Sequence, residues 1–309
     1  MHIEWLNSKY ALDAIGLEAK YHDFIHLAEA KEKPDLEVIK LVFNSKSHIT
    51  AFLESCASFN WDHNSRVFAL GLVSDRIQTE FDFSASFDLN DPVIWFGTNE
   101  QEKKFQEYFR NKMARIAKKG DSQGPVIAYQ RHLSGETHPM SVSLGDFKTH
   151  FDKAESQVRA ARAIFFNLNA IRRQDSYFDL SHITGLDIYE ACQLLRFCGL
   201  SSDHSFLFYN IGYNSPLEQS WECIATTIWY YIEGKNNRNI EMVDEQENQL
   251  YFVENSLFDE PVNFIKGYQT KRWWLIHPET KEKIPCAESD YISLRDGHIP
   301  DILLNLCVE

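Results

Sequence analysis

The sequence predicts an α/β protein in three layers, with a mostly parallel sheet between two layers of helices. Short apolar segments alternate with amphipathic segments of helical period over most of the chain, which is typical of such folds. Residues 163–169 and 205–211 are apolar on both faces, as the central strands of a covered parallel sheet are. Hydrophobic residues make up 44% of the 309 residues, which is enough for a large core.

The expected strands are short, rich in β-branched and aromatic residues, and bounded by polar or turn-forming residues. In chain order they are residues 37–43, 66–73, 92–97, 125–129, 163–169 and 205–211. The expected helices repeat apolar side chains at three- and four-residue spacing, at residues 48–59, 99–117, 144–161, 186–197 and 218–232. Gly199 is expected to end the fourth of these helices, and roughly the first 35 residues are also expected to be helical.

The pattern changes after Gly234, which predicts two parts of the chain. Residues 1–234 carry the strand and helix alternation and are expected to form one α/β domain. Residues 235–309 begin with a polar segment and continue with strand-like pieces, and they are expected to form a C-terminal extension packed on that domain. Residues 271–274 (KRWW) are expected to anchor this extension through an indole; the alternative is that they stack on a base or a partner.

Charge and composition exclude several classes of protein. Acidic residues outnumber basic ones by 45 to 31, and a net charge of −14 opposes general binding to nucleic acid. No apolar run has the roughly 18 residues of a membrane span, and the N-terminal residues lack the apolar run of a signal peptide, so a cytoplasmic protein is expected. The 6 cysteines form no CxxC pair and are expected to be reduced residues of the core.

Common site motifs are missing or incomplete. No GxGxxG or GxxxxGK[ST] sequence follows an expected strand, and the GxSxG match at residues 120–124 (GDSQG) is expected to be an exposed loop and not a nucleophile elbow. His22 and His26 are four residues apart and can share a helix face, but no third metal ligand lies near them. Cys192 and Cys198 fall on different faces of their helix, so packing roles are expected for these residues.

A series of blocks from residue 144 to residue 234 is more specific. AIFFNLN, GLDIYEACQLLRF, SFLFYNIGYN and WECIATTIWYYIEG follow one another in an order that resembles the C-terminal half of the ureohydrolase superfamily, which includes arginase, agmatinase and formimidoylglutamase. The resemblance covers residues 92–309 and lies in the order of the blocks. It implies an arginase-like α/β/α fold, hydrolysis of linear amidines, and trimers or hexamers. It also implies two manganese ions that convert a bridging water to hydroxide.

The family's metal ligands are replaced in this chain. Asn99 stands where the resemblance places the histidine of a Gly-Gly-Asp-His turn, and Asn167 and Asn169 stand at the positions of an Asp-x-Asp pair. Gly212 stands where a substrate-side glutamate is expected, and the Asp-Ala-His-x-Asp motif is absent. Neutral amides lack the charge that holds two dications together, so the resemblance implies a degenerate site and no manganese cofactor.

The sequence therefore predicts an arginase-like or formimidoylglutamase-like pseudoenzyme that acts by binding or assembly, with a protein partner or a second copy of itself. Asn99, Asn167 and Asn169 are expected at the carboxyl ends of parallel strands, around one cleft. One alternative is a divergent hydrolase of guanidino or formimidoyl substrates, in which the loop residues Asp175, Asp179 and His182 rebuild a site. The other alternative is a metal-free sensor of a small molecule.

Overall fold

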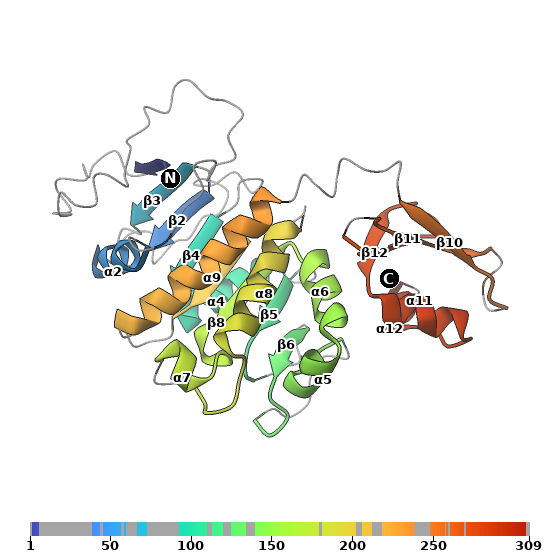
Figure 1. The fold of residues 1–309 in the computed structure, drawn as a ribbon, viewed down its shortest axis with the longest axis horizontal. Helices are drawn as coiled ribbons and strands as arrows, with labels where there is room; N and C mark the ends of the chain where they lie inside the picture. Colours follow the sequence, from blue (N-terminus) through green and yellow to red (C-terminus); the bar gives the residue numbers. More distant parts are fainter. Residues whose placement is uncertain are drawn as a thin grey trace.

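The computed structural model contains two separate β-sheets (Figure 1). It describes residues 2–5, 39–43, 46–56, 59, 67–72, 93–109, 113–119, 125–133, 140–178, 181–201, 206–211, 218–237, 248–256, 258, 260–268 and 270–306. A nine-stranded sheet carries the strands up to β9, and a four-stranded sheet carries the later ones.

The larger sheet is parallel at every described pair of strands, which confirms the predicted sheet. Its strands are β1 (His2–Trp5), β2 (Ile39–Phe43), β3 (Val67–Leu72), β4 (Val93–Gly97), β5 (Met113–Ile116), β6 (Val126–Tyr129), β7 (Val142–Ser143), β8 (Ala163–Asn167) and β9 (Phe206–Asn210). The spatial order is β1-β3-β2-β4-β9-β8-β5-β6-β7. The central strands β8 and β9 are buried on both faces along almost their whole length, as their apolar sequences predict.

Helices cover both faces of this sheet, which confirms the three-layer prediction. They are α2 (Lys46–Cys56), α4 (Asn99–Phe109), α5 (Leu144–Thr149), α6 (Phe151–Ala160), α7 (Arg173–Ser176), α8 (Ile188–Leu200) and α9 (Glu218–Asn236). Phe166 and Tyr209 point to the core shared with α2, α6, α8 and α9, whereas Phe165 and Phe208 point to a second core under α4. Successive strand residues therefore fill two different cores. Figure 1 shows α8 and α9 together over the middle of the sheet.

Three sequence expectations about local structure are wrong. The helix expected at residues 99–117 ends at Phe109, and Met113–Ile116 forms β5, because pairing with β6 and β8 stabilises these residues more than continuation of the helix. The helix expected at residues 144–161 is divided at His150 into α5 and α6. His2–Trp5 forms a strand that pairs with β3; His22 and His26 lie outside the described residues.

Gly199 lies inside α8 and does not end it. Its lack of a side chain allows two helices to pack closely. A Cβ atom at Gly199 would collide with the main-chain oxygen of Tyr231, and one at Gly234 would collide with that of Arg196. The two glycines thus let α8 and α9 approach backbone to backbone. The ion pair between Arg196 Nε and Glu233 Oε2, at 2.5 Å, joins the same two helices.

Gly199→Ala is expected to lower the free energy of unfolding by about 1–3 kcal/mol, because the added methyl group forces α8 and α9 apart. Urea denaturation measures this change. Gly145→Ala is the matched control: its Cβ would lie 3.9 Å from the nearest atom, in an exposed part of α5, so a gain of up to about 1 kcal/mol is expected. Equal stability of the parent and the Gly199 variant would contradict the close packing of these helices.

The smaller sheet belongs to the C-terminal extension and is antiparallel. It consists of β10 (Gln249–Val253), β11 (Val262–Lys266), β12 (Trp273–Ile276) and β13 (Lys283–Cys286), followed by α11 (Glu288–Arg295) and α12 (Asp301–Leu306). A core of its own forms between this sheet and these helices, around Phe264, Trp273, Leu275 and Leu294. The helix α9 runs through the boundary expected at Gly234 as far as Asn236.

The extension contacts α6 through β13 and α11, and buried charges take part in the contact. Arg159 on α6 donates from Nε to Glu155 at 2.8 Å and from Nη2 to the main-chain oxygens of Trp273 and Cys286. Arg272 of the extension forms an ion pair of 3.1 Å with the same Glu155. The three charged side chains are each at least nine-tenths buried, and one carboxylate is shared by two guanidinium groups across this interface.

The two adjacent tryptophans have different roles. Trp273 stacks on Tyr291 at 4.8 Å between ring centroids and belongs to the extension's own core. Trp274 lies under the guanidinium group of Arg159, which is 4.7 Å from its ring, and so it contacts α6 directly. Trp274 is half-buried and contacts α6, whereas the buried indole, Trp273, packs within the extension, so the two properties of the expected buried anchor are divided between these residues.

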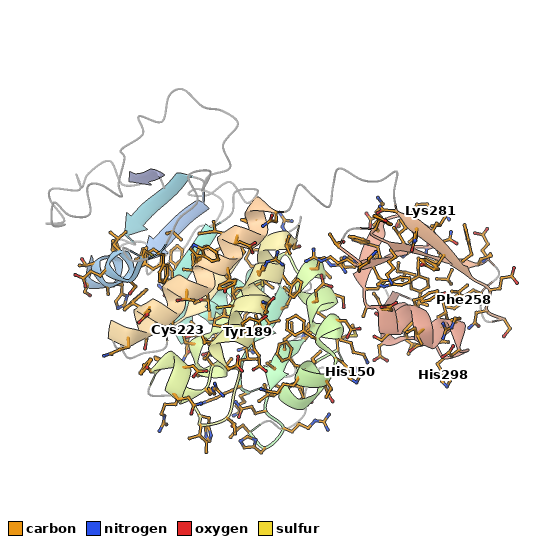
Figure 2. All side chains as sticks on the ribbon, viewed as in Figure 1. His150, Tyr189, Cys223, Phe258, Lys281 and His298 are labelled. Atoms are coloured by element: carbon orange, nitrogen blue, oxygen red, sulfur yellow. The ribbon has the colours of Figure 1, made fainter. Side chains whose placement is uncertain are left out.

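Five cysteines are described, and all five are free and buried: Cys56, Cys192, Cys198, Cys223 and Cys286. Burial raises the pKa of each thiol, that of Cys192 to about 12. These residues are therefore the reduced core cysteines that the sequence predicts; Cys223 is labelled on α9 in Figure 2. No helix among the described residues has the length and apolar character needed to cross a membrane.

Candidate functional site

The carboxyl ends of β4, β9 and β8 bring together residues that are far apart in the sequence. Gly97, Asn210 and Asn167 end these three strands and are in register with one another. The helix α4 begins at Asn99, two residues after β4. Ligands of open α/β sheets bind at this edge, so the structure places Asn99 and Asn167 where a site is expected.

A buried hydrogen-bond network joins the first turn of α4 to these strand ends. Asn210 donates from Nδ2 to Asn99 Oδ1 at 2.5 Å and also to Glu102 Oε2. Glu102 accepts from Arg115 on β5 at 3.1 Å and from Gln106 at 2.7 Å. We call Asn99, Glu102, Arg115, Asn167, Asn169 and Asn210 the carboxyl-edge cluster.

The sequence did not single out Glu102, Arg115 or Asn210. A signal was present for Asn210, which is the one strongly polar residue of the apolar segment 205–211 besides its first serine. In the structure the side chain of Asn210 is buried against Glu102, which is only 4% exposed. A buried carboxylate needs such partners, because an unpaired buried charge is strongly destabilising.

Asn167 and Asn169 are engaged with the backbone. Asn167 Oδ1 accepts from the main-chain N–H of Asn169 at 3.2 Å and caps a short 3-10 helix, Leu168–Ala170. The Oδ1 atom of Asn169 is buried and has no hydrogen-bond partner among the described residues. The neutral amide of Asn167 is thus used to shape the chain after β8.

The loop that follows β8 carries the two described residues of the alternative site. Asp175 Oδ2 accepts from Arg172 Nε at 2.6 Å and from the main-chain N–H of Ile188 at 3.1 Å, so it fastens α7 to the start of α8. His182 is exposed, and its ring centre lies 5.9 Å from that of His132. Asp179 and Gly212 lie outside the described residues.

Positive charge also gathers at this edge of the sheet. Lys118 follows β5, and Arg173 begins α7 after β8. Burial lowers the pKa of Lys118, and the nearby charge of Arg173 lowers it further. Two cations that repel each other make this part of the edge unfavourable for a metal ion.

Comparison with known proteins adds to this geometry. No family model matches the sequence, and no curated protein matches it. A variant of a formiminoglutamase of Trypanosoma cruzi, crystallised with manganese, superposes with a TM-score of 0.52 at 11% identity, over 68% of this chain and 96% of that chain. An agmatine ureohydrolase of Thermoplasma volcanium superposes with a TM-score of 0.50 at 9% identity, over 68% and 93%.

The fold is that of the ureohydrolases. This result confirms the fold that the sequence blocks predict, an arginase-like α/β/α arrangement with a parallel sheet. At such low identity the likeness concerns the fold alone, and a site on a ureohydrolase fold has to be judged from its side chains.

The carboxyl-edge cluster does not fit the two manganese ions that this fold implies. Two adjacent manganese ions need anionic ligands to offset their charge, whereas Asn99, Asn167 and Asn169 offer neutral amides. The carboxylate of this cluster, Glu102, is bonded to Arg115, Gln106 and Asn210. Within the described part of the chain, no group of three or more His, Cys, Asp or Glu side chains is placed to hold a metal.

Proposed function

We propose that this protein is a ureohydrolase-fold pseudoenzyme that acts by binding or assembly and not by manganese-dependent hydrolysis. The carboxyl-edge cluster is the observation that supports the proposal. Its amides bond to each other and to the backbone, and its buried acid is neutralised by Arg115 at 3.1 Å. A dinuclear centre brings two dications within about 4 Å, and only a strongly anionic set of ligands stabilises that arrangement.

Assembly has support from exposed apolar side chains near the same edge. Ile183 is 77% exposed and Tyr189 is 65% exposed, both in or just after the loop that follows β8; Figure 2 labels Tyr189 at the start of α8. A contiguous exposed apolar patch marks a contact surface, and the proposal takes these two side chains to belong to one such patch. The molar mass in solution, measured by sedimentation equilibrium, is expected to correspond to more than one chain.

Metal analysis tests the proposal directly. Purified protein is incubated with manganese, dialysed and analysed, and its metal content is expected to stay far below one ion per chain. Arginine, agmatine and formimidoylglutamate are expected to release neither urea nor formamide. Two bound manganese ions per chain would contradict the proposal, and product release without manganese would favour the divergent hydrolase.

A thermal-shift screen with the same three compounds distinguishes a metal-free sensor of a small molecule from a protein that binds another chain. A ligand that binds only the folded chain raises its melting temperature in proportion to ln(1 + [L]/Kd). Stabilisation by one of these compounds, in protein free of manganese, would favour a sensor that keeps the family's ligand without its metal. No stabilisation by any of them is expected for a protein that binds another chain.

The double variant Asn167→Asp, Asn169→Asp is expected to melt at a lower temperature than the parent at neutral pH. At residue 169 the new carboxylate takes the place of a buried amide oxygen that has no described donor, so desolvation raises its pKa. The neighbouring new charge acts in the same direction. A pKa raised by folding means that stability falls as pH rises through the carboxylate range, so the deficit should shrink as pH is lowered.

The comparison is made with the parent at each pH by scanning calorimetry, so that general acid effects cancel. Manganese is expected to restore little stability to the double variant, because the remaining ligands and the groups that orient them are missing. Stoichiometric manganese binding by this variant, with release of urea or formamide, would mean that hidden ligands complete the site.

A further inference from the structure

A cavity of about 470 Å³ lies between α6 and the C-terminal extension. One wall comes from β7, α5 and α6, and the other comes from β13, α11 and α12. This volume is in the range of small-molecule sites, which occur preferentially where two parts of a protein meet. The cavity shares no residue with the carboxyl-edge cluster, so it is a different candidate site.

Hydrogen-bond acceptors in this cavity exceed the donors available to them. Gln157 donates from its amide nitrogen to the main-chain oxygen of Met140 at 2.6 Å, which fixes the orientation of the amide group. The other end of this side chain, Gln157 Oε1, is buried and has no partner among the described residues. A buried acceptor without a donor costs about 1–3 kcal/mol, which a ligand N–H group removes.

Carboxylates also outnumber cations along the walls. Asp146, Asp290 and Asp301 line the cavity, together with Lys153 and His150; Figure 2 labels His150 between α5 and α6. Asp146 is engaged, because it bonds to Arg131 at 2.8 Å and to Ser143 at 2.5 Å.

Asp290 and Asp301 come from the extension side. Asp290 uses one oxygen to accept from the main-chain N–H of Ala287 at 2.8 Å. Burial raises the pKa of Asp290, and the charges of Asp152 and Asp301 raise it further, whereas Lys153 lowers it. Lys153 is the cation that the lining of this cavity offers to Asp290 and Asp301.

Part of the rest of the lining is aliphatic. Val142, Ala160, Ile284 and Ile302 contribute apolar surface beside the acidic groups. A ligand that matches both features has a positively charged nitrogen with several N–H donors and a short hydrocarbon body.

We propose that the cavity between α6 and the extension binds a small aliphatic amine, whose ammonium group donates to Asp290, Asp301 and Gln157 Oε1. The hydrocarbon body of the amine lies against the aliphatic wall. The ligand bridges the extension and the part of the chain that carries the nine-stranded parallel sheet, which we call the parallel sheet unit. Gln157 lies on α6 of that unit, whereas both acids lie on the extension.

Isothermal titration of the full chain with 1,4-diaminobutane tests the proposal, with 1,4-butanediol as the neutral probe of similar shape. One diamine is expected to bind per chain, and the diol is expected not to bind. Asp290→Asn and Asp301→Asn are each expected to weaken the diamine at least tenfold, as loss of a charged hydrogen bond does. Asp296→Asn is the matched control, since this exposed residue pairs with Arg295 outside the cavity and its replacement should change nothing.

Lys153→Gln is expected to change the affinity for the diamine in the opposite direction, which makes the test more specific. Removing this cation is expected to tighten diamine binding, because it leaves the carboxylates to the ligand. Weaker diamine binding by this variant would mean that Lys153 supports the site and does not compete with the ammonium group for its carboxylates, and would overturn the proposal. Asp290 also caps α11, so if Asp290→Asn does not fold, the result for Asp301→Asn decides.

Two further results would overturn the proposal. Equal loss of affinity in Asp296→Asn would mean that the diamine responds only to the charge of −14 on the whole chain. Absence of any diamine binding up to millimolar concentration would mean that ordered water alone satisfies Gln157.

Discussion

Glu155→Gln is expected to lower the free energy of unfolding by about 3–5 kcal/mol. Glu155 is the carboxylate that faces both Arg159, at 2.8 Å, and Arg272, at 3.1 Å. The amide keeps the volume of the side chain but removes its charge, so Arg159 and Arg272 each lose a buried ion pair. Because Arg272 belongs to the extension and Arg159 to α6, the loss acts at the interface between them. Unfolding in urea measures the change. The ionic denaturant guanidinium chloride is avoided.

Glu288→Gln is the control for this substitution. Glu288 pairs with Lys266 at 3.1 Å and its side chain is 52% exposed, so about 0.5 kcal/mol or less is expected. A similar small effect for both variants would mean that water reaches Glu155 and solvates the two arginines. The double variant Glu155→Gln, Arg272→Gln should recover part of the loss, since it removes one of the uncompensated charges.

Trp273→Ala is expected to destabilise the chain by about 3–5 kcal/mol, because it empties the centre of the extension's core. The indole is 3% exposed and stacks on Tyr291 beside Tyr251. Trp274→Ala removes a half-buried ring whose main partner is the Arg159 guanidinium group at 4.7 Å. About 1–2 kcal/mol is expected for that variant, the range of a partly desolvated cation–π contact.

The ratio of the two effects tests their different roles. Scanning calorimetry of each variant is sufficient, with the parent measured at the same concentration. Unchanged melting of both variants would indicate that this pair of indoles forms an exposed binding surface and not a core.

The fold was predictable where one local pattern determined one element. Residues 163–169 and 205–211 are apolar on both faces, and they became β8 and β9 in the middle of the sheet. The strand at Met113–Ile116 was missed because its apolar residues continue the helical spacing of Phe105 and Phe109, and only pairing with β6 and β8 makes it a strand. The prediction that Gly199 ends its helix was wrong for a similar reason, because Tyr231, which Gly199 contacts on α9, is distant in the sequence.

The candidate site was predictable only in part. The positions of Asn99 and Asn167 followed from the ends of expected strands, and the structure places both at one edge. Asn210 lies 111 residues from Asn99, and the two meet only because β9 inserts between β4 and β8. The ion pair of Arg272 could not be predicted for the same reason. Its carboxylate partner lies on α6, and nothing in the neighbouring sequence indicates the pair.

The five buried cysteines provide chemical markers of unfolding in both parts of the chain. Cys286 lies in the core of the extension, whereas Cys56, Cys198 and Cys223 lie in the core of the parallel sheet unit. A thiol reacts as its thiolate, so burial and the raised pKa protect each of these residues until its surroundings open. The order in which an alkylating reagent modifies them therefore reports whether the extension opens before the parallel sheet unit, in the chain without any substitution.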